Sequence, residues 1–278
     1  MKLATMLAAA LVAAVLTTTA ALGAAGTKTT ASLPELDVTM NGSSVVVGGT
    51  LESGAVTVHS VASGANSGSP LLIRLNDGVQ ANDLITFLGT KAAQDPNTVV
   101  DFGSIDFDVQ GGPGTNDVQT ILQPGNYVAF DASKSNPANW PNTTFTIADN
   151  PTPMTLPAVK QSQRAIEFGF KGPATLHAGQ LLRTSNSGFL VHMMVGIRVK
   201  NKAAGLEAVK YLYAGKDRKV NKLIQGFFSW FGPVSHGAVQ QFTLTEKPGW
   251  YVEACFMDTQ DGREHTKLGM ERLIHIVK

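Results

Sequence analysis

The sequence predicts an all-β protein of two tandem Greek-key β-sandwich domains, each with a short helical insertion. Short stretches rich in valine, isoleucine, threonine and aromatic residues recur along the chain, and glycine and proline turns separate them. Many short strands with frequent turn signals are typical of antiparallel sandwiches. We therefore expect strands at residues 43–49, 55–61, 69–75, 126–132, 143–149, 165–170, 179–185, 191–199, 239–245, 250–256 and 271–277.

The two halves of the chain also match each other. The stretch around Arg74 aligns with the stretch around Arg198, and Pro124 aligns with Pro248; both pairs are 124 residues apart. A common offset at two separate positions indicates a duplicated domain. We expect a first domain at residues 26–150, a second at residues 159–278, and between them a stiff, proline-containing linker at residues 151–158.

The helical insertion follows the aligned arginine in each half. In the second half Leu206, Val209 and Leu212 recur at three-residue steps. This spacing predicts an amphipathic helix whose apolar face packs on the sandwich.

The first 25 residues have the pattern of a secretory signal peptide. Lys2 precedes an apolar, alanine-rich run, and small residues follow near the expected cleavage position. The sequence therefore predicts an exported protein, periplasmic or extracellular, without stable membrane insertion after cleavage. Exported proteins normally use cysteines in pairs, but this chain has a single cysteine, Cys255. That thiol is left as a buried side chain, an intermolecular link or a metal ligand.

Charge is unevenly distributed along the chain. Residues 26–155 contain 4 basic and 12 acidic side chains, net −8, whereas residues 156–278 contain 17 basic and 9 acidic side chains, net +8. Such asymmetry can hold the halves together or steer a charged protein partner to the basic half, although solvated surfaces without a partner are equally compatible with it. We expect no nucleic-acid partner.

Three side chains with metal-binding chemistry lie close together near the end of the sequence. Cys255 is followed by His265 and then by Met270, between the expected strands 250–256 and 271–277. His192 opens an earlier strand of the same half. Two imidazoles, a thiolate and a thioether form a ligand set that suits copper in both of its oxidation states. The alternative is that Cys255 is a small buried side chain with a structural role.

The second half resembles the cupredoxins, the plastocyanin and azurin type of β-sandwich, and in particular tandem exported bacterial members of that group. The resemblance implies one copper ion bound by His192, Cys255, His265 and Met270, with the exposed edge of His265 as the route for electrons. The residues that carry it are Pro248, Gly249, Tyr251, Cys255, Phe256, Asp261, Gly262, His265, Gly269 and Met270.

The sequence departs from the cupredoxin pattern after the first histidine. Met193 follows His192, where the family usually has a polar residue that braces the site. In addition, strict alternation along residues 191–199 would turn His192 away from the apolar face of its strand. In the first half the positions that match His192 and Cys255 are Gly68 and Asp131, so no equivalent site is expected there.

The predicted function is that of an exported copper-binding protein, either a single-electron carrier or a copper-holding protein. A redox partner would dock on the basic second domain. Catalysis is not expected, because the first half has only His59, too few histidines for a second metal centre, and no third group orients a Cys–His nucleophile. The alternative is a metal-free β-sandwich that serves as a binding or scaffold module of the cell envelope.

An aromatic run and a basic run lie between the expected strands of the second half. We expect the aromatic residues 226–233 to cover one end of the sandwich, and the basic side chains nearby to form a solvated face. The basic side chains are Lys216, Arg218, Lys219 and Lys222.

Overall fold

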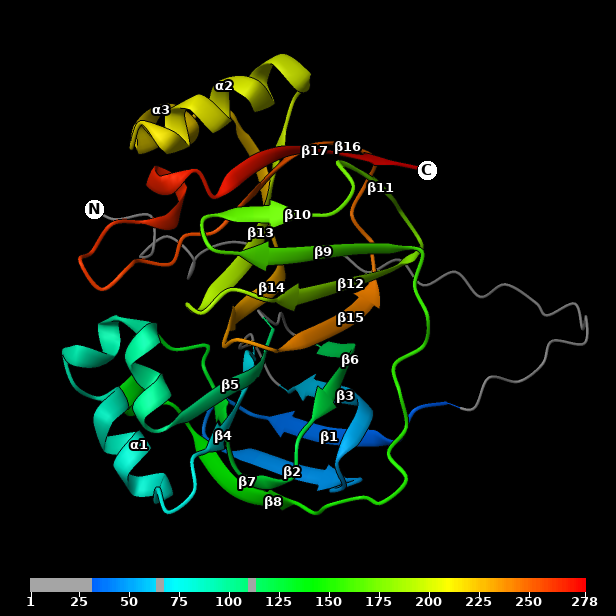
Figure 1. Cartoon of the computed structure of the whole chain (residues 1–278), viewed down its shortest axis with the longest axis vertical. Coiled ribbons are helices and arrows are strands. Elements are labelled where there is room, and N and C mark those ends of the chain that lie inside the picture. Colours follow the sequence, from blue (N-terminus) through cyan, green and yellow to red (C-terminus); the bar gives the residue numbers. More distant parts are fainter. Residues whose placement is uncertain (1–31, 64–67, 110–113) are drawn as a thin grey trace, which may run out of the picture.

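The computed structural model describes residues 32–63, 68–109 and 114–278, and in these residues the chain is all-β, as predicted (Figure 1). The predicted signal peptide lies outside the described residues. Among the described residues no helix is both long and apolar enough to cross a membrane. Figure 1 shows the second half above the first, with α2 and α3 at the top and α1 at the lower left.

Among its described residues the first half has eight strands, one α-helix and three 3₁₀ segments. Its strands are β1 (Glu35–Met40), β2 (Val45–Gly49), β3 (Gly54–Ala62), β4 (Pro70–Leu75), β5 (Gly103–Asp108), β6 (Gly114–Leu122), β7 (Gly125–Asp131) and β8 (Asn142–Ile147). Its helical segments are α1 (Ala81–Leu88), η2 (Ala92–Gln94), η3 (Pro96–Asp101) and η4 (Pro137–Asn139).

The second half has nine strands and three helical segments. Its strands are β9 (Gln161–Ile166), β10 (Gly169–Lys171), β11 (Thr175–His177), β12 (Leu181–Asn186), β13 (His192–Val199), β14 (Ile224–Val234), β15 (Val239–Thr243), β16 (Gly249–Ala254) and β17 (Glu271–Val277). Its helical segments are α2 (Lys202–Tyr213), α3 (Asp217–Val220) and η5 (His265–Leu268).

One eight-stranded sheet runs through both halves, in the order β10-β9-β12-β15-β6-β3-β1-β2 (Figure 1). Each half adds a sheet of its own: β5-β4-β7-β8 in the first and β11-β17-β16-β13-β14 in the second. The halves join where β15 pairs antiparallel with β6, Gln240 opposite Thr120 and Gln241 opposite Gln119. The Thr120 hydroxyl also donates to the carbonyl of Val239 (2.7 Å). The two sandwiches therefore share a sheet, which the sequence did not predict.

Positions 124 residues apart make matching contacts in the two halves. The Tyr127 hydroxyl donates to the carbonyl of Gln123 (2.9 Å), and the Tyr251 hydroxyl donates to that of Lys247 (2.7 Å). This is the tyrosine corner of Greek-key sandwiches, in which a buried phenol ties a strand to the turn before it. Both phenol rings are fully buried.

The predicted helix in the second half is present, and Val209 and Leu212 of its predicted apolar face pack against the core, but Leu206 does not. Helix α2 begins at an N-cap, Asn201, whose side chain accepts from the Ala204 N–H (3.0 Å). Gly205, Ala208 and Leu212 are buried, whereas Leu206 is 47% exposed. The helix face with small residues, Gly205 and Ala208, packs on the sheet, because Leu273 of β17 occupies the space that a Cβ at position 205 would need.

Two predictions from the sequence were wrong: that residues 165–170 form one strand, and that the aromatic run 226–233 covers an end of the sandwich. The stretch 165–170 is a hairpin, in which Glu167 and Phe168 form the turn between β9 and β10. The aromatic run 226–233 does not cover an end of the sandwich; it lies within β14 and pairs with β13. Trp230 and Phe231 are nonetheless buried in the core, and the basic side chains of the α3 region are exposed, as predicted.

The segment of residues 151–158, predicted as the linker, has no helix or strand and packs along both halves. In Figure 1 it runs up the right-hand edge from β8 towards β9. The carbonyl of Met154 accepts from the Ala55 N–H (2.9 Å), and the carbonyl of Pro157 accepts from the Arg183 guanidinium (2.8 Å). Hydrogen bonds near both of its ends therefore hold this segment in place.

Asp108 is a buried carboxyl between the halves, and it predicts a pH-dependent stability. Its side chain packs against Gly232 of β14, and burial raises its pKa to about 8. Below its ordinary pKa the carboxyl is protonated in both the folded and the unfolded state, so its burial does not lower the free energy of unfolding. As the pH rises from there towards 8, only the unfolded state loses the proton, and the free energy of unfolding falls by about 1.4 kcal/mol per pH unit.

We therefore expect Asp108→Asn to raise the free energy of unfolding relative to the wild type, and to raise it more at pH 7 than at pH 5. Urea unfolding at the two pH values measures the difference, with the exposed Asp77→Asn as the control. Equal differences at both pH values would contradict burial of an unpaired carboxyl at this position.

Candidate metal centre

The structure brings His192, Cys255 and His265 together in the interior of the second half. All three side chains are fully buried, and the Cys255 Sγ atom and one nitrogen of each imidazole lie within 4.8 Å of one another. The Sγ atom is 3.8 Å from His192 Nδ1 and 3.4 Å from His265 Nδ1. Among the described residues this is the only such group of three histidine, cysteine or acidic side chains.

His192 reaches the cluster because the start of β13 is irregular. The pairing of β13 with β14 shifts register between His192 and Met194, and again between Met194 and Val195. Each such bulge changes which face the following side chain takes. Strict alternation, which would have turned His192 away, therefore fails at this position, and His192 and Met193 are both buried.

The loop from β16 to β17 supplies the other members of the predicted site. Cys255 directly follows β16, and its N–H donates to the carbonyl of Met270 (3.1 Å). The Met270 N–H in turn donates to the carbonyl of His265 (3.0 Å), which closes the η5 turn. Gly269 makes this closure possible with a left-handed φ of 96°. The Met270 side chain is fully buried, and these backbone hydrogen bonds join its residue directly to Cys255 and His265.

The same burial changes the proton affinity of all three groups. Burial raises the pKa of the Cys255 thiol to about 12, although the N–H of Met193 donates to its Sγ atom (3.4 Å). Burial lowers the pKa of both His192 and His265 to about 4. At neutral pH both imidazoles are therefore neutral and have a lone pair available, and the thiol must lose its proton when a metal binds.

The donor set fits copper. Both Nδ1 atoms face the sulfur. One thiolate, two neutral imidazoles and a thioether are the ligands that favour copper in both oxidation states. The buried Nε2 atoms of His192 and His265 form no hydrogen bond within the described residues. The Nδ1 atoms, whose only polar contact among the described residues is the Cys255 sulfur, are therefore the nitrogens placed to bind a metal.

The turn between β9 and β10 covers the cluster, which the sequence did not reveal. The Phe168 ring lies edge-on against His265, with ring centroids 5.3 Å apart. A Glu167 oxygen lies 3.7 Å from His192 Nε2, and that carboxylate also accepts from the N–H groups of Phe189 and Leu190. The resemblance implied an exposed edge of His265; that expectation is wrong, because Phe168 packs over the ring.

Gly188 allows the backbone to approach His192 closely. A Cβ at position 188 would lie 2.6 Å from His192 Nε2 and 2.7 Å from the Glu167 carboxylate. Phe189, the next residue, is 89% exposed and stacks on His236, whose Nδ1 is 2.9 Å from the Gly188 carbonyl oxygen. His192 is therefore separated from the surface by little more than one glycine and one carboxylate.

A residue of the first half also contacts the loops of the site. The side chain of Asn97, in η3, accepts from the Val191 N–H (2.7 Å) and donates to the carbonyl of Asp258 (3.1 Å). Val191 directly precedes His192, and Asp258 lies three residues after Cys255. A sequence reading could not find this contact, because nothing in the local pattern of η3 signals it.

The first half has no corresponding ligand cluster among its described residues. Asp131 stands where Cys255 stands in the second half, and its carboxylate accepts from the Ser69 N–H (3.1 Å), as Cys255 accepts from the N–H of Met193. His59 is at the surface beside Asp117 (2.6 Å). The same backbone position is thus kept while the metal-binding side chain is replaced.

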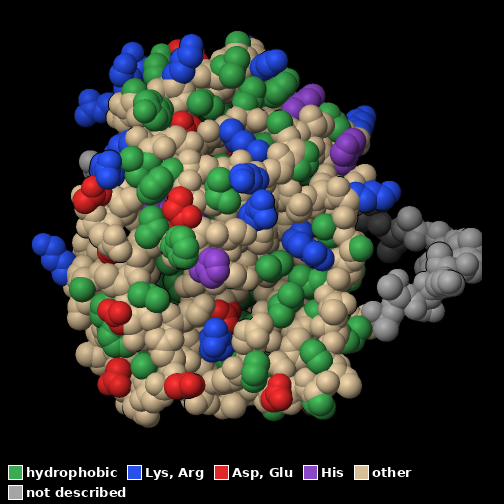
Figure 2. Space-filling view, in the orientation of Figure 1, with side chains coloured by type: hydrophobic (Ala, Val, Ile, Leu, Met, Phe, Trp, Pro, Cys, Tyr) green, Lys and Arg blue, Asp and Glu red, His purple; other side chains and the backbone are tan. Residues whose placement is uncertain are grey.

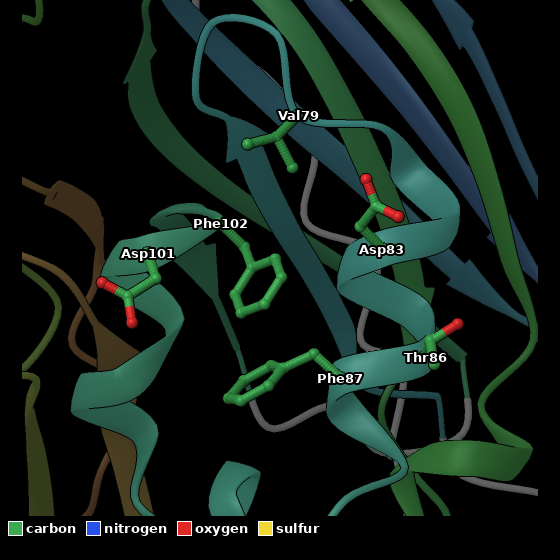
Figure 3. A pocket seen from close by; sticks show the side chains of 6 residues that line it. All are labelled: Val79, Asp83, Thr86, Phe87, Asp101 and Phe102. Atoms are coloured by element: carbon green, nitrogen blue, oxygen red, sulfur yellow. The ribbon is translucent and has the colours of Figure 1, made fainter.

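A cavity of about 470 Å³ lies away from the cluster, in the first half (Figure 3). Figure 3 shows the side chains of Phe87, on α1, and Phe102 next to each other in its lining, and their rings stack with centroids 4.4 Å apart. Asp83 and Asp101 lie at its edges. None of the four predicted ligands lines this cavity.

Comparison with known proteins finds cupredoxins among solved structures. The chain is similar to dithionite-reduced auracyanin from Roseiflexus castenholzii (12% identity, 42% of this chain and 95% of that one, TM-score 0.26). It is also similar to a copper-containing nitrite reductase from Thermus scotoductus (11% identity, 88% of this chain and 67% of that one, TM-score 0.26). An azurin from a Methylomonas strain matches at 11% identity, over 42% of this chain and 96% of that one, with a TM-score of 0.24.

No protein-family model matches the chain, and no curated protein matches it. TM-scores of 0.24 to 0.26 are too low to support an argument about fold or function.

Proposed function

We propose that the protein binds one copper ion through His192, Cys255, His265 and Met270 and carries single electrons. The convergence of the Cys255 sulfur and both Nδ1 atoms at one buried point is the observation that supports this most strongly. A bound copper ion would supply one-electron exchange at that point. The Cys255 thiolate would be the dominant ligand, the two imidazoles would complete the set of strong donors, and the Met270 thioether would be a weak fourth ligand.

Burial of the cluster favours electron transfer over chemistry on a substrate. Each of the four side chains is fully buried, so a substrate has no direct access to the metal position. An electron needs no such access, because it can pass through a thin layer of protein. The same burial fixes the ligands in place and limits rearrangement when the charge of the metal changes.

The His192 side of the cluster is the proposed route for electrons, in place of the His265 edge. His192 Nε2 lies beneath Glu167 and Gly188, and the exposed Phe189 marks the surface there. A redox partner would dock against Phe189. The second half is the basic one, and Figure 2 shows most Lys and Arg side chains over the upper part of the visible face, so a partner with an acidic surface fits best.

We further propose that the protein is exported and that its halves are duplicated domains with the boundaries given above. The single unpaired cysteine is compatible with export if a metal occupies it. The recurrence of the tyrosine corner and of the backbone contact to position 131 or 255 supports the duplication.

Voltammetry of the copper-loaded protein tests the proposal of an electron carrier. We expect a reversible one-electron wave, with absorption that bleaches on reduction and returns in full on reoxidation. Copper bound in a single oxidation state without a reversible wave would instead indicate a copper-holding protein. A protein that binds no copper would indicate the metal-free scaffold module.

A further inference from the structure

The first half contacts the candidate copper site through one side chain, Asn97. Its Oδ1 accepts from the N–H of Val191, the residue before His192, at 2.7 Å. Its Nδ2 donates to the carbonyl of Asp258, three residues after Cys255, at 3.1 Å. One amide therefore connects the segment that carries His192 with the loop that carries Cys255.

The Asp258 contact also bears on the second histidine. Asp258 forms an isolated antiparallel bridge with Glu264, the residue before His265. Beside it, the His265 N–H donates to the carbonyl of Met257 (2.8 Å). A side chain that fixes the carbonyl of Asp258 thus restrains both arms of the loop, towards Cys255 and towards His265.

Asn97 is itself held firmly from the first half. The Asp95 carboxylate accepts from the backbone N–H of Asn97 (2.9 Å) and from its Nδ2 (2.8 Å), as the N-cap of η3. Only 8% of Asn97 is exposed. Since Nδ2 has two acceptors and Oδ1 has a donor, the amide has one orientation that satisfies every partner.

We propose that Asn97 is a positioning residue of the metal centre, and that the first half fixes the ligand geometry of the second. Its amide replaces the polar brace that Met193 cannot provide from within the second half. An aspartate at this position would set a carboxylate against the Asp258 carbonyl, and an apolar side chain would leave the buried Val191 N–H without a partner. The inference rests on the proposed copper function.

Three variants test the inference. Asn97→Ala removes both contacts to the second half. Asn97→Asp keeps an acceptor for the Val191 N–H and loses the donor to Asp258. Asn76→Ala is the matched control, because the Asn76 side chain donates to the carbonyl of Val100 in the same η3 segment (2.8 Å) and makes no contact with the site loops.

Two measurements are made on each variant. Hydrogen exchange of the Val191 amide in the copper-free protein reports the brace itself. Copper affinity, with the absorption and EPR spectra of the copper-loaded protein, reports the ligand geometry. Loss of a bracing contact around metal ligands typically lowers metal affinity about 10- to 100-fold.

We expect Asn97→Ala to speed exchange at Val191, to lower copper affinity about 10- to 100-fold and to change the EPR spectrum. Asn97→Asp should keep the slow exchange at Val191 and still weaken copper binding, and Asn76→Ala should match the wild type in both measurements. If both Asn97 variants had the copper affinity and spectra of the wild type, the positioning role of Asn97 would be wrong, and the proposed copper function would stand. A wild-type protein that binds no copper would overturn the proposed function, and the positioning role with it.

Discussion

Replacing Cys255 with serine is expected to abolish the intense visible absorption of the copper-loaded protein. That absorption requires a thiolate bound to copper, and a serine hydroxyl does not ionise at neutral pH. Serine is close to cysteine in size, and its oxygen can accept from the Met193 N–H as the sulfur does at 3.4 Å. The fold should therefore persist while strong copper binding is lost. Absorption spectra and elemental copper analysis of the purified variant measure both effects.

His59→Gln is the control for copper bound outside the cluster, because His59 is at the surface beside Asp117 and remote from Cys255 in the fold. It should leave both colour and stoichiometry unchanged. If Cys255→Ser retained the wild-type spectrum, the thiolate would not be the ligand, and the assignment of the site would be wrong.

Arg272→Met is expected to destabilise the second half by about 3–5 kcal/mol, because it leaves a buried carboxylate without its partner. Arg272 Nε donates to Glu253 Oε2 at 2.6 Å, and Glu253 is fully buried on β16. The same guanidinium donates to the side chain of Gln163, in β9 of the opposite sheet, and to the carbonyl of Gly172, which directly follows β10 (3.0 Å). It therefore ties together the two sheets of the sandwich that holds the metal centre.

The loss should depend on pH. Burial raises the pKa of Glu253 even with Arg272 beside it, and removal of the guanidinium raises this pKa further. The variant should recover stability as the pH falls and Glu253 takes up a proton. Urea unfolding at several pH values measures this, and the double variant Arg272→Met/Glu253→Gln should regain much of the loss at neutral pH. A loss of the same size in the double variant would show that packing of the arginine, and not its charge, is what matters.

The sequence predicted the fold class and the ligand cluster because both have local signals. Strands such as β4, β7, β13, β16 and β17 are short β-branched or aromatic runs between turns. Cys255, His265 and Met270 were found because the only cysteine of the chain shares one loop with a histidine and a methionine. His192 was found because it opens a strand in the same half, and strict alternation along that strand argued against it until the bulge in β13 was seen.

Other features were missed because they depend on contacts between distant segments. Asn97 is 94 residues from Val191 in sequence, and no pattern in η3 indicates that it contacts the other half of the chain. Glu167 and Phe168 were assigned to a strand, so a turn over the metal centre was not expected. The pairing of β15 with β6 involves glutamine and threonine side chains, which do not mark a buried strand in a sequence.

The first half thus has a role that does not need a metal of its own. It keeps the backbone position of Cys255 with an aspartate, shares a sheet with the second half, and contributes Asn97 to the loops of the site. The described residues of the first half have no copper ligands, and Asn97 contacts the loops of the second half, which is compatible with different roles for the two halves.

Titration of the purified wild-type protein with copper(II), followed by absorption spectroscopy, tests the central claim most directly. We predict an intense visible band that rises to a sharp end point at one copper ion per chain. A colourless protein at that end point, or weak binding of copper without a defined stoichiometry, would contradict a copper site formed by His192, Cys255, His265 and Met270.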